Sequence, residues 1–119
     1  MKILIVNSSD IEGGAARATY RIHESLLSAG IDSKLLVIDK KSDDHTVIGP
    51  KGYKEKLIIQ FRKFLDRLPV KFYKDRTKTI FSPSLVPFSS IVDKINKLNP
   101  DIVHLHWICN GMFNITDLC

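Results

Sequence analysis

The 119-residue sequence lacks the features that mark several classes of protein. Its two cysteines, Cys109 and Cys119, have a spacing that fits neither a metal site nor a disulfide framework. The longest apolar run near the start, Ile3 to Val6, is far shorter than a signal-peptide core or the roughly 20 residues of a membrane span. A single globular domain in a reducing, cytoplasmic setting is therefore the simplest interpretation.

Several catalytic and cofactor motifs are also missing. The sequence contains no GxGxxG dinucleotide fingerprint, no GK[ST] of a phosphate-binding P-loop and no GxSxG nucleophile motif. It shows no paired carboxylates at a recognisable site. We therefore assign no catalytic residue within this chain, and we expect no resident cofactor and no metal.

The pattern of apolar residues predicts an α/β fold. Residues 2–7 (KILIVN) are typical of a strand buried on both faces of a parallel sheet. Apolar residues then recur at intervals of three and four from Ala15 to Ala29, which predicts a helix that ends at Gly30. Residues 33–39 form a second apolar run. Together they make a βαβ unit, and we expect a Rossmann-like three-layer domain with a mostly parallel sheet.

The rest of the chain continues this pattern less regularly. We expect a short strand near Val47, a helix that Pro69 ends, a brief strand at residues 79–81 and a helix over 91–98. Residues 101–107 (DIVHLHW) predict a further strand, and residues 114–118 the beginning of a helix. Such a helix would normally cover a face of the sheet, so we expect the domain to be incomplete at its C-terminal end.

The turn between the first strand and the first helix is a candidate binding loop. Gly13 and Gly14 let the backbone approach a ligand closely, and the following helix presents free N–H groups and the positive end of its dipole. Ligands of open α/β sheets bind at the carboxyl ends of the strands, where this turn lies. A tight turn whose glycines serve geometry alone is the alternative.

The end of the 101–107 strand is the second candidate. Alternation places His104 and His106 on one side of the strand and Trp107 on the other. His106 and Trp107 can contact a sugar, through hydrogen bonds and an apolar stacking face, whereas we expect His104 to be buried and satisfied. Two histidines at this spacing also suit zinc, but no third ligand stands nearby in the sequence.

The segment Lys51–Lys78 contains ten basic and three acidic residues, so its net charge of +7 exceeds the +5 of the whole chain. The simplest interpretation is a helix that packs an apolar stripe on the sheet and leaves a basic face in solvent. An anionic membrane surface is an alternative partner. Nucleic acid is not expected, because no nucleic-acid-binding motif accompanies the charge. The apolar stripe consists of Leu57, Ile58, Phe61, Phe64, Leu65 and Leu68.

Two stretches together resemble the N-terminal domain of family-4 (group 1) glycosyltransferases of the kind that build bacterial polysaccharides. They are KILIVNSSDIEGGAARATYRIHESLLSAGIDSKLLV and NPDIVHLHWICNGMFNITDL, and the likeness is weaker between residues 39 and 88. The resemblance implies a GT-B fold, in which two Rossmann-like domains face each other across a cleft. This chain would be the first half, the acceptor-side domain over residues 1–119.

The resemblance also implies roles for individual residues. Gly13, Gly14 and Arg17 would form the loop near the donor phosphates. The acceptor-side cleft would be lined by Asp10, His106, Trp107 and Asn110.

The whole enzyme would transfer a sugar, with retention and usually without a metal, from a nucleotide-sugar to a polysaccharide or lipid-linked acceptor. It would work in the cytoplasm, peripherally at the inner membrane face. The donor-binding domain, with its paired-glutamate motif, and a further strand ending in an active-site histidine are not in this sequence, so we expect the chain alone to be inactive. A non-enzymatic Rossmann-like module that binds an anionic ligand or partner is the alternative.

Overall fold

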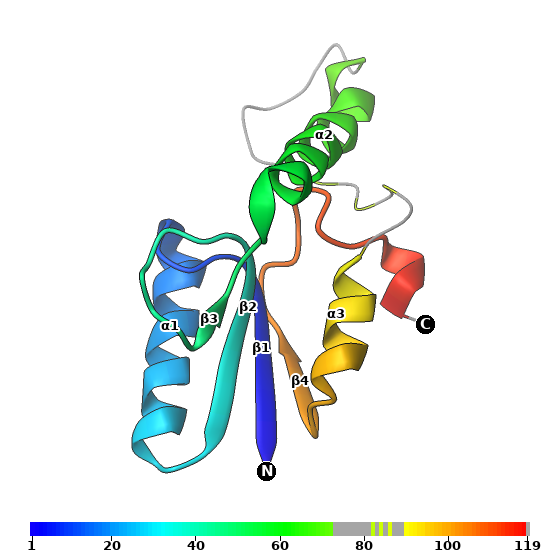
Figure 1. The fold of residues 1–119 in the computed structure, drawn as a ribbon. Helices are drawn as coiled ribbons and strands as arrows, with labels where there is room; N and C mark the ends of the chain where they lie inside the picture. Colours follow the sequence, from blue (N-terminus) through cyan, green and yellow to red (C-terminus); the bar gives the residue numbers. More distant parts are fainter. Residues whose placement is uncertain (73–81, 83, 85, 87–89, 119) are drawn as a thin grey trace.

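A computed structural model of the chain describes residues 1–72, 82, 84, 86 and 90–118. Its four strands form one sheet in the order β3–β2–β1–β4, and every neighbouring pair is parallel (Figure 1). The strands are β1 (Lys2–Ser9), β2 (Asp32–Asp39), β3 (Val47–Ile48) and β4 (Ile102–Leu105). The helices are α1 (Gly13–Ser28), α2 (Gly52–Lys71) and α3 (Ile91–Leu98), with a 3-10 turn η1 at Ile115–Leu118.

Alternation along the central strands divides the core into two layers. Side chains such as Ile5 and Leu35 pack on the α1 side of the sheet, with Tyr20 and Leu26 beside them. Their sequence neighbours point the other way and pack against α3 and the segment after β4. The β1 strand is buried on both faces because its apolar run has no polar alternation. The expected Rossmann-like α/β fold with helices on both sides of a parallel sheet is therefore confirmed.

Most of the predicted elements agree with the structure. The helix after β1 begins two residues earlier than its apolar pattern, at Gly13, and ends before Gly30, which has a φ of +77°. The short strand at Val47 and the helix over 91–98 are confirmed, and Asn99 closes α3 with a left-handed backbone. The strand predicted at 79–81 lies outside the described residues.

The prediction that Pro69 ends the second helix is wrong. Helix α2 continues to Lys71 with Pro69 inside it. A proline removes one N–H and crowds the preceding turn, but near the end of a helix few hydrogen bonds remain to be lost.

The expected burial of the apolar stripe of α2 is also wrong. Leu57, Ile58, Phe61 and Phe64 are between 49% and 62% exposed, whereas Asp66 on the opposite face is only 2% exposed. The helix thus turns polar side chains toward the rest of the domain. Across the described part of the chain, no helix has the length and apolar character to cross a membrane.

His23 links α1 to β2 and to the residue that precedes β3. It is fully buried, and its two ring nitrogens lie 2.8 Å from the Ser33 and Thr46 hydroxyl oxygens. Burial lowers the pKa of His23, against the opposing effect of Asp44 and Glu24. The ring is therefore neutral in the folded protein at neutral pH.

This burial predicts a loss of stability in mild acid. Because the folded pKa lies below the ordinary value, the unfolded chain takes up the proton first, and stability falls as pH drops below about 6.5. His23→Gln should flatten this pH dependence in urea unfolding series, whereas His45→Gln, at an exposed side chain, should not. His106, whose pKa is lowered by burial and by His104, should account for what remains. An unchanged slope in His23→Gln would contradict this assignment.

Candidate functional site

The candidate site lies where the topology of the sheet changes direction. From β1 the chain runs outward through β2 to β3, and it then returns to pair β4 with the other edge of β1 (Figure 1). In open α/β sheets, this switch point leaves a crevice at the carboxyl ends of the two strands. In this chain the switch point lies between the loop after β1, which leads to Gly13, and the segment after β4, which begins at His106.

The ends of β1 and β4 are held side by side. Beyond the regular pairing, the His106 amide donates to the Val6 carbonyl oxygen and the Ser8 amide donates to the Trp107 carbonyl oxygen, both at 3.0 Å. Since the two strands are parallel, the diglycine turn and the histidine-tryptophan segment lie at the same edge of the sheet. This is the geometry that a shared binding crevice requires.

The N-terminus of α1 is open toward solvent. Gly13 is the first helical residue, with a φ of +91°, and a Cβ added at Gly13 or Gly14 would meet nothing within 4 Å. Glu12 makes no side-chain cap, and the first turn contains no acidic residue. The charge of Glu12 is instead paired with Lys41. The first N–H groups of this 16-residue helix therefore remain available to an anion.

Arg17 adds a positive charge near this terminus. It lies four residues after Gly13, on the same side of the helix, and its side chain is exposed. The loop residues that the sequence singled out, Gly13, Gly14 and Arg17, are thus brought together. Their common chemistry is the binding of a negatively charged group.

Among the candidate acceptor-side residues, His106 has the side chain best suited to bind a sugar. It is partly buried, and its Nε2 is shielded from solvent and has no hydrogen-bond partner among the described residues. Burial and then the neighbouring His104 lower the pKa of His106, so the ring is neutral at neutral pH. A neutral imidazole with an unsatisfied nitrogen is suited to a hydroxyl partner, which can donate or accept.

The prediction that His104 is buried is wrong. Its ring lies 4.3 Å from that of His106, but the residue is exposed on β4 rather than buried. The reason is that β4 is an edge strand whose four residues are all exposed. Within the described ranges, no third metal-ligating side chain joins the two histidines.

The four residues expected to line one acceptor-side cleft do not all meet. Trp107 lies on the face of β4 opposite to His106, as alternation requires, and is 37% exposed. Asn110 lies farther along, beside Gly111 and Met112, in a pocket on the α3 side. Of His106, Trp107 and Asn110, only His106 lies on the α1 side of the sheet.

Asp10 has a structural role at this edge. It is 1% exposed, and its carboxylate oxygens accept N–H groups from Lys41 at 3.0 Å and Ser42 at 2.9 Å. Burial opposes ionisation, but the hydrogen bonds from Ser42 and Lys41 outweigh it and hold the pKa of Asp10 below its usual value. Asp10 therefore fixes the loop after β2 against the loop after β1, and both of its oxygens are engaged.

Asn7 is a positioning residue that the sequence analysis missed. Its side chain is buried, donates to the Ser9 carbonyl oxygen at 2.6 Å and accepts the Trp107 amide at 3.1 Å. It thereby links the carboxyl ends of β1 and β4 directly. The available signal was a single amide at the end of an otherwise apolar strand, where a buried polar group needs partners.

A pocket of about 170 Å³ lies under α2, on the α3 side of the sheet. An ion pair between Glu55 and Lys94 borders it. Burial raises the pKa of Glu55, but the hydrogen bonds from Lys94 and from the Lys51 amide, with the charges of both lysines, together lower it. Arg62 donates through Nε to the Gly111 carbonyl oxygen at 2.8 Å. The sequence does not point to these residues, because its apolar pattern predicts that the opposite face of α2 packs on the core. The other lining residues are Val37, Ile38, Ile58, Ile59, Ser90, Ile91, Asn110 and Met112.

Comparison with protein-family models, with curated proteins and with solved structures gives no match. The class that the fold defines is a Rossmann-like α/β domain with a topological switch point between β1 and β4. Function therefore has to be argued from the residues at that edge of the sheet.

Proposed function

We propose that this chain is the N-terminal, acceptor-side domain of a retaining glycosyltransferase that transfers a sugar from a nucleotide-sugar to a polysaccharide or lipid-linked acceptor. The observation that carries the proposal is the uncapped, glycine-led N-terminus of α1, which opens at the same edge of the sheet as His106. The proposed setting is the cytoplasmic face of a membrane.

The two parts of a nucleotide-sugar suit the two groups of residues at this edge of the sheet, the N-terminus of α1 and His106. Its diphosphate is the leaving group, and negative charge grows on it as the bond to the sugar breaks. The N–H groups of Gly13 and Gly14, the helix dipole and Arg17 can stabilise that charge without moving. The neutral His106 can hydrogen-bond a hydroxyl of the transferred sugar or of the acceptor.

The resemblance to family-4 glycosyltransferases supports the same assignment. Its two most specific pieces, GGAAR and PDIVHLHW, are far apart in the sequence but lie at the same edge of the sheet. A second domain would provide most donor contacts, so we expect this chain to bind the donor weakly.

The proposal predicts where a nucleotide-sugar binds. In ¹⁵N-resolved NMR titrations with UDP-glucose, GDP-mannose, UDP and GDP, we expect saturable shifts at the amides of Gly13, Gly14 and Ala15, with a Kd on the order of 1 mM for the preferred compound. Gly14→Asp should weaken this binding about tenfold relative to Gly14→Asn, because it places a like charge at the anion site. Both variants have open space for the new side chain.

The stability of each variant shows whether a loss of binding comes from the site itself or from unfolding of the protein. An acid near a helix N-terminus is favourable, so Gly14→Asp should unfold no more easily than Gly14→Asn. Equal binding by the two variants, or shifts confined to other amides, would refute the proposal. A different result would favour the non-enzymatic anion-binding module. Inorganic diphosphate would then bind as tightly as every nucleotide-sugar, and His106→Ala would not change the difference in affinity between a nucleotide-sugar and its nucleotide.

A further inference from the structure

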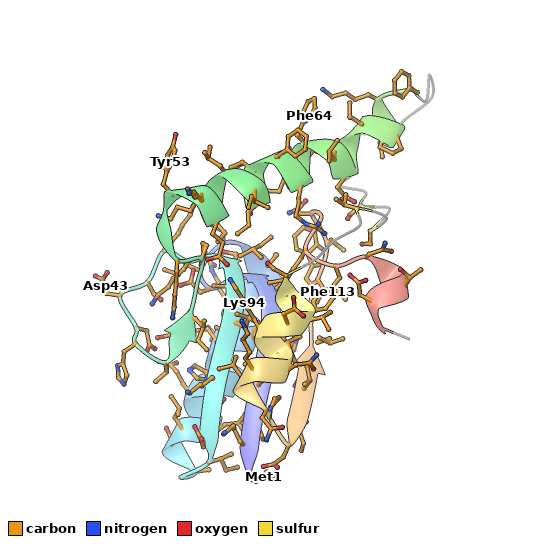
Figure 2. All side chains as sticks on the ribbon, turned by 45° about the vertical axis from the view of Figure 1, so that its right-hand side comes forward. Met1, Asp43, Tyr53, Phe64, Lys94 and Phe113 are labelled. Atoms are coloured by element: carbon orange, nitrogen blue, oxygen red, sulfur yellow. The ribbon has the colours of Figure 1, made fainter. Side chains whose placement is uncertain are left out.

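The outer face of α2, defined here as Tyr53, Leu57, Ile58, Phe61 and Phe64, is an unusual concentration of exposed apolar side chains. Exposure ranges from 49% for Leu57 to 76% for Tyr53 along this 20-residue helix. Figure 2 shows Tyr53 and Phe64 projecting from α2 on the side away from the sheet. Isolated exposed apolar residues are ordinary, but a row at helical spacing indicates a surface that contacts something.

Polar contacts on the inner face hold α2 in this orientation. Glu55 pairs with Lys94 of α3, and Arg62 donates to the Gly111 carbonyl oxygen. Asp66 accepts the Ser84 amide at 3.1 Å and the Ser82 hydroxyl. Rolling the helix about its axis would break these bonds, and hydrogen bonds to charged groups contribute about 1.5–3 kcal/mol each. The apolar face therefore stays outward.

The charges on the surface of α2 all have one sign. Over the described residues 51–72, the two acids, Glu55 and Asp66, turn inward, and every fully exposed charge is basic. The Lys71 ammonium lies 5.4 Å from the centre of the Phe64 ring, so a cation lies directly beside the apolar row. The exposed basic residues are Lys51, Lys54, Lys56, Arg67 and Lys71.

We propose that the outer face of α2 docks on an anionic membrane surface. Apolar side chains on one face with cations beside them are the combination that places a helix in the lipid interface, with the rings among the acyl chains and the cations at the headgroups. The helix would lie on the bilayer rather than cross it. The inference stands on α2 alone and does not rest on the proposed function.

The chemistry of this face favours a membrane surface over a second copy of the chain and over a nucleic acid. A second copy paired about a two-fold axis would set the same cations against each other across the interface. A nucleic acid would attract the cations but would leave the aromatic and aliphatic side chains without an apolar environment. Because α2 lies across the carboxyl edge of the sheet (Figures 1 and 2), docking would bring that edge close to the lipid surface.

Vesicle flotation with the full chain tests this inference. We expect binding to phosphatidylcholine vesicles that contain phosphatidylglycerol, and little binding to phosphatidylcholine alone. Phe61→Ser with Phe64→Ser should weaken binding about tenfold or more, since it removes two of the inserted rings. Lys54→Gln, Lys56→Gln and Arg67→Gln together should weaken it about 100-fold at low salt.

Matched controls use similar side chains elsewhere. Ile22→Ser with Leu27→Ser changes two exposed apolar residues of α1, and Arg21→Gln with Lys97→Gln removes two exposed charges. Both should retain binding, and circular dichroism should show all variants folded. Absent binding, or binding independent of phosphatidylglycerol, would overturn the proposal. So would a dimer in light scattering that Phe61→Ser with Phe64→Ser abolishes, if vesicles are not bound.

Discussion

Replacing Asp10 by alanine is expected to destabilise the protein by about 2–4 kcal/mol and to loosen the carboxyl edge of the sheet. The substitution removes the buried carboxylate that accepts the backbone N–H groups of Lys41 and Ser42, and it leaves a space in its place. Urea unfolding should show the loss, and amide hydrogen exchange should show it locally at residues 41 and 42.

The pH dependence gives a second test of the same bonds. The pKa of Asp10 is lower in the folded state, so its contribution is complete above the ordinary carboxyl pKa and is lost as pH falls through the folded pKa. Wild type should therefore lose more stability in acid than Asp10→Ala does. Asp43→Ala, at an exposed position of the same loop, is the matched control and should cost less than about 0.5 kcal/mol. Equal effects of the two alanines would show that Asp10 does not hold the loop.

Gly111→Ala should be almost as damaging, by about 2–4 kcal/mol, for two separate reasons. Gly111 has a φ of +70°, which an L side chain rarely adopts. The added Cβ would also lie 2.7 Å from the backbone carbonyl oxygen of Arg62, inside α2. Because a backbone atom cannot turn aside, α2 has to move away from the segment after β4. Urea unfolding measures the loss.

Gly14→Ala is the control for this substitution. A Cβ at Gly14 meets nothing within 4 Å, and the residue lies inside α1 without a positive φ. Alanine there should stabilise the protein by up to about 1 kcal/mol through helix propensity and the restricted unfolded chain. If both alanines were tolerated equally, the close approach of Gly111 to α2 would be refuted.

Asn7 and Asp10 show why the candidate crevice was only partly predictable. Glycines after a strand, followed by a helical pattern, predict a candidate anion-binding loop from local sequence alone, and Gly13 and Gly14 were proposed in this way. The partners of Asn7 and Asp10 are 100 and 31 residues away, respectively. No local pattern encodes such pairs, since each depends on which strand ends the sheet brings together.

His104 illustrates the same limit. Its alternation with His106 was correctly predicted, because a strand has a period of two. Its exposure was not, because exposure depends on β4 lying at the edge of the described sheet.

The sequence by itself determined the α/β class, the βαβ unit of β1, α1 and β2, and the existence of an amphipathic second helix. These follow from apolar periodicity and from glycine and asparagine at helix ends, which are local properties. Only the tertiary structure decided which face of α2 turns inward, which side chains close the carboxyl edge and which histidine is exposed. Either face of an amphipathic helix can turn toward the core. Here the partly buried bonds of Glu55, Arg62 and Asp66 to distant segments decide which face does so.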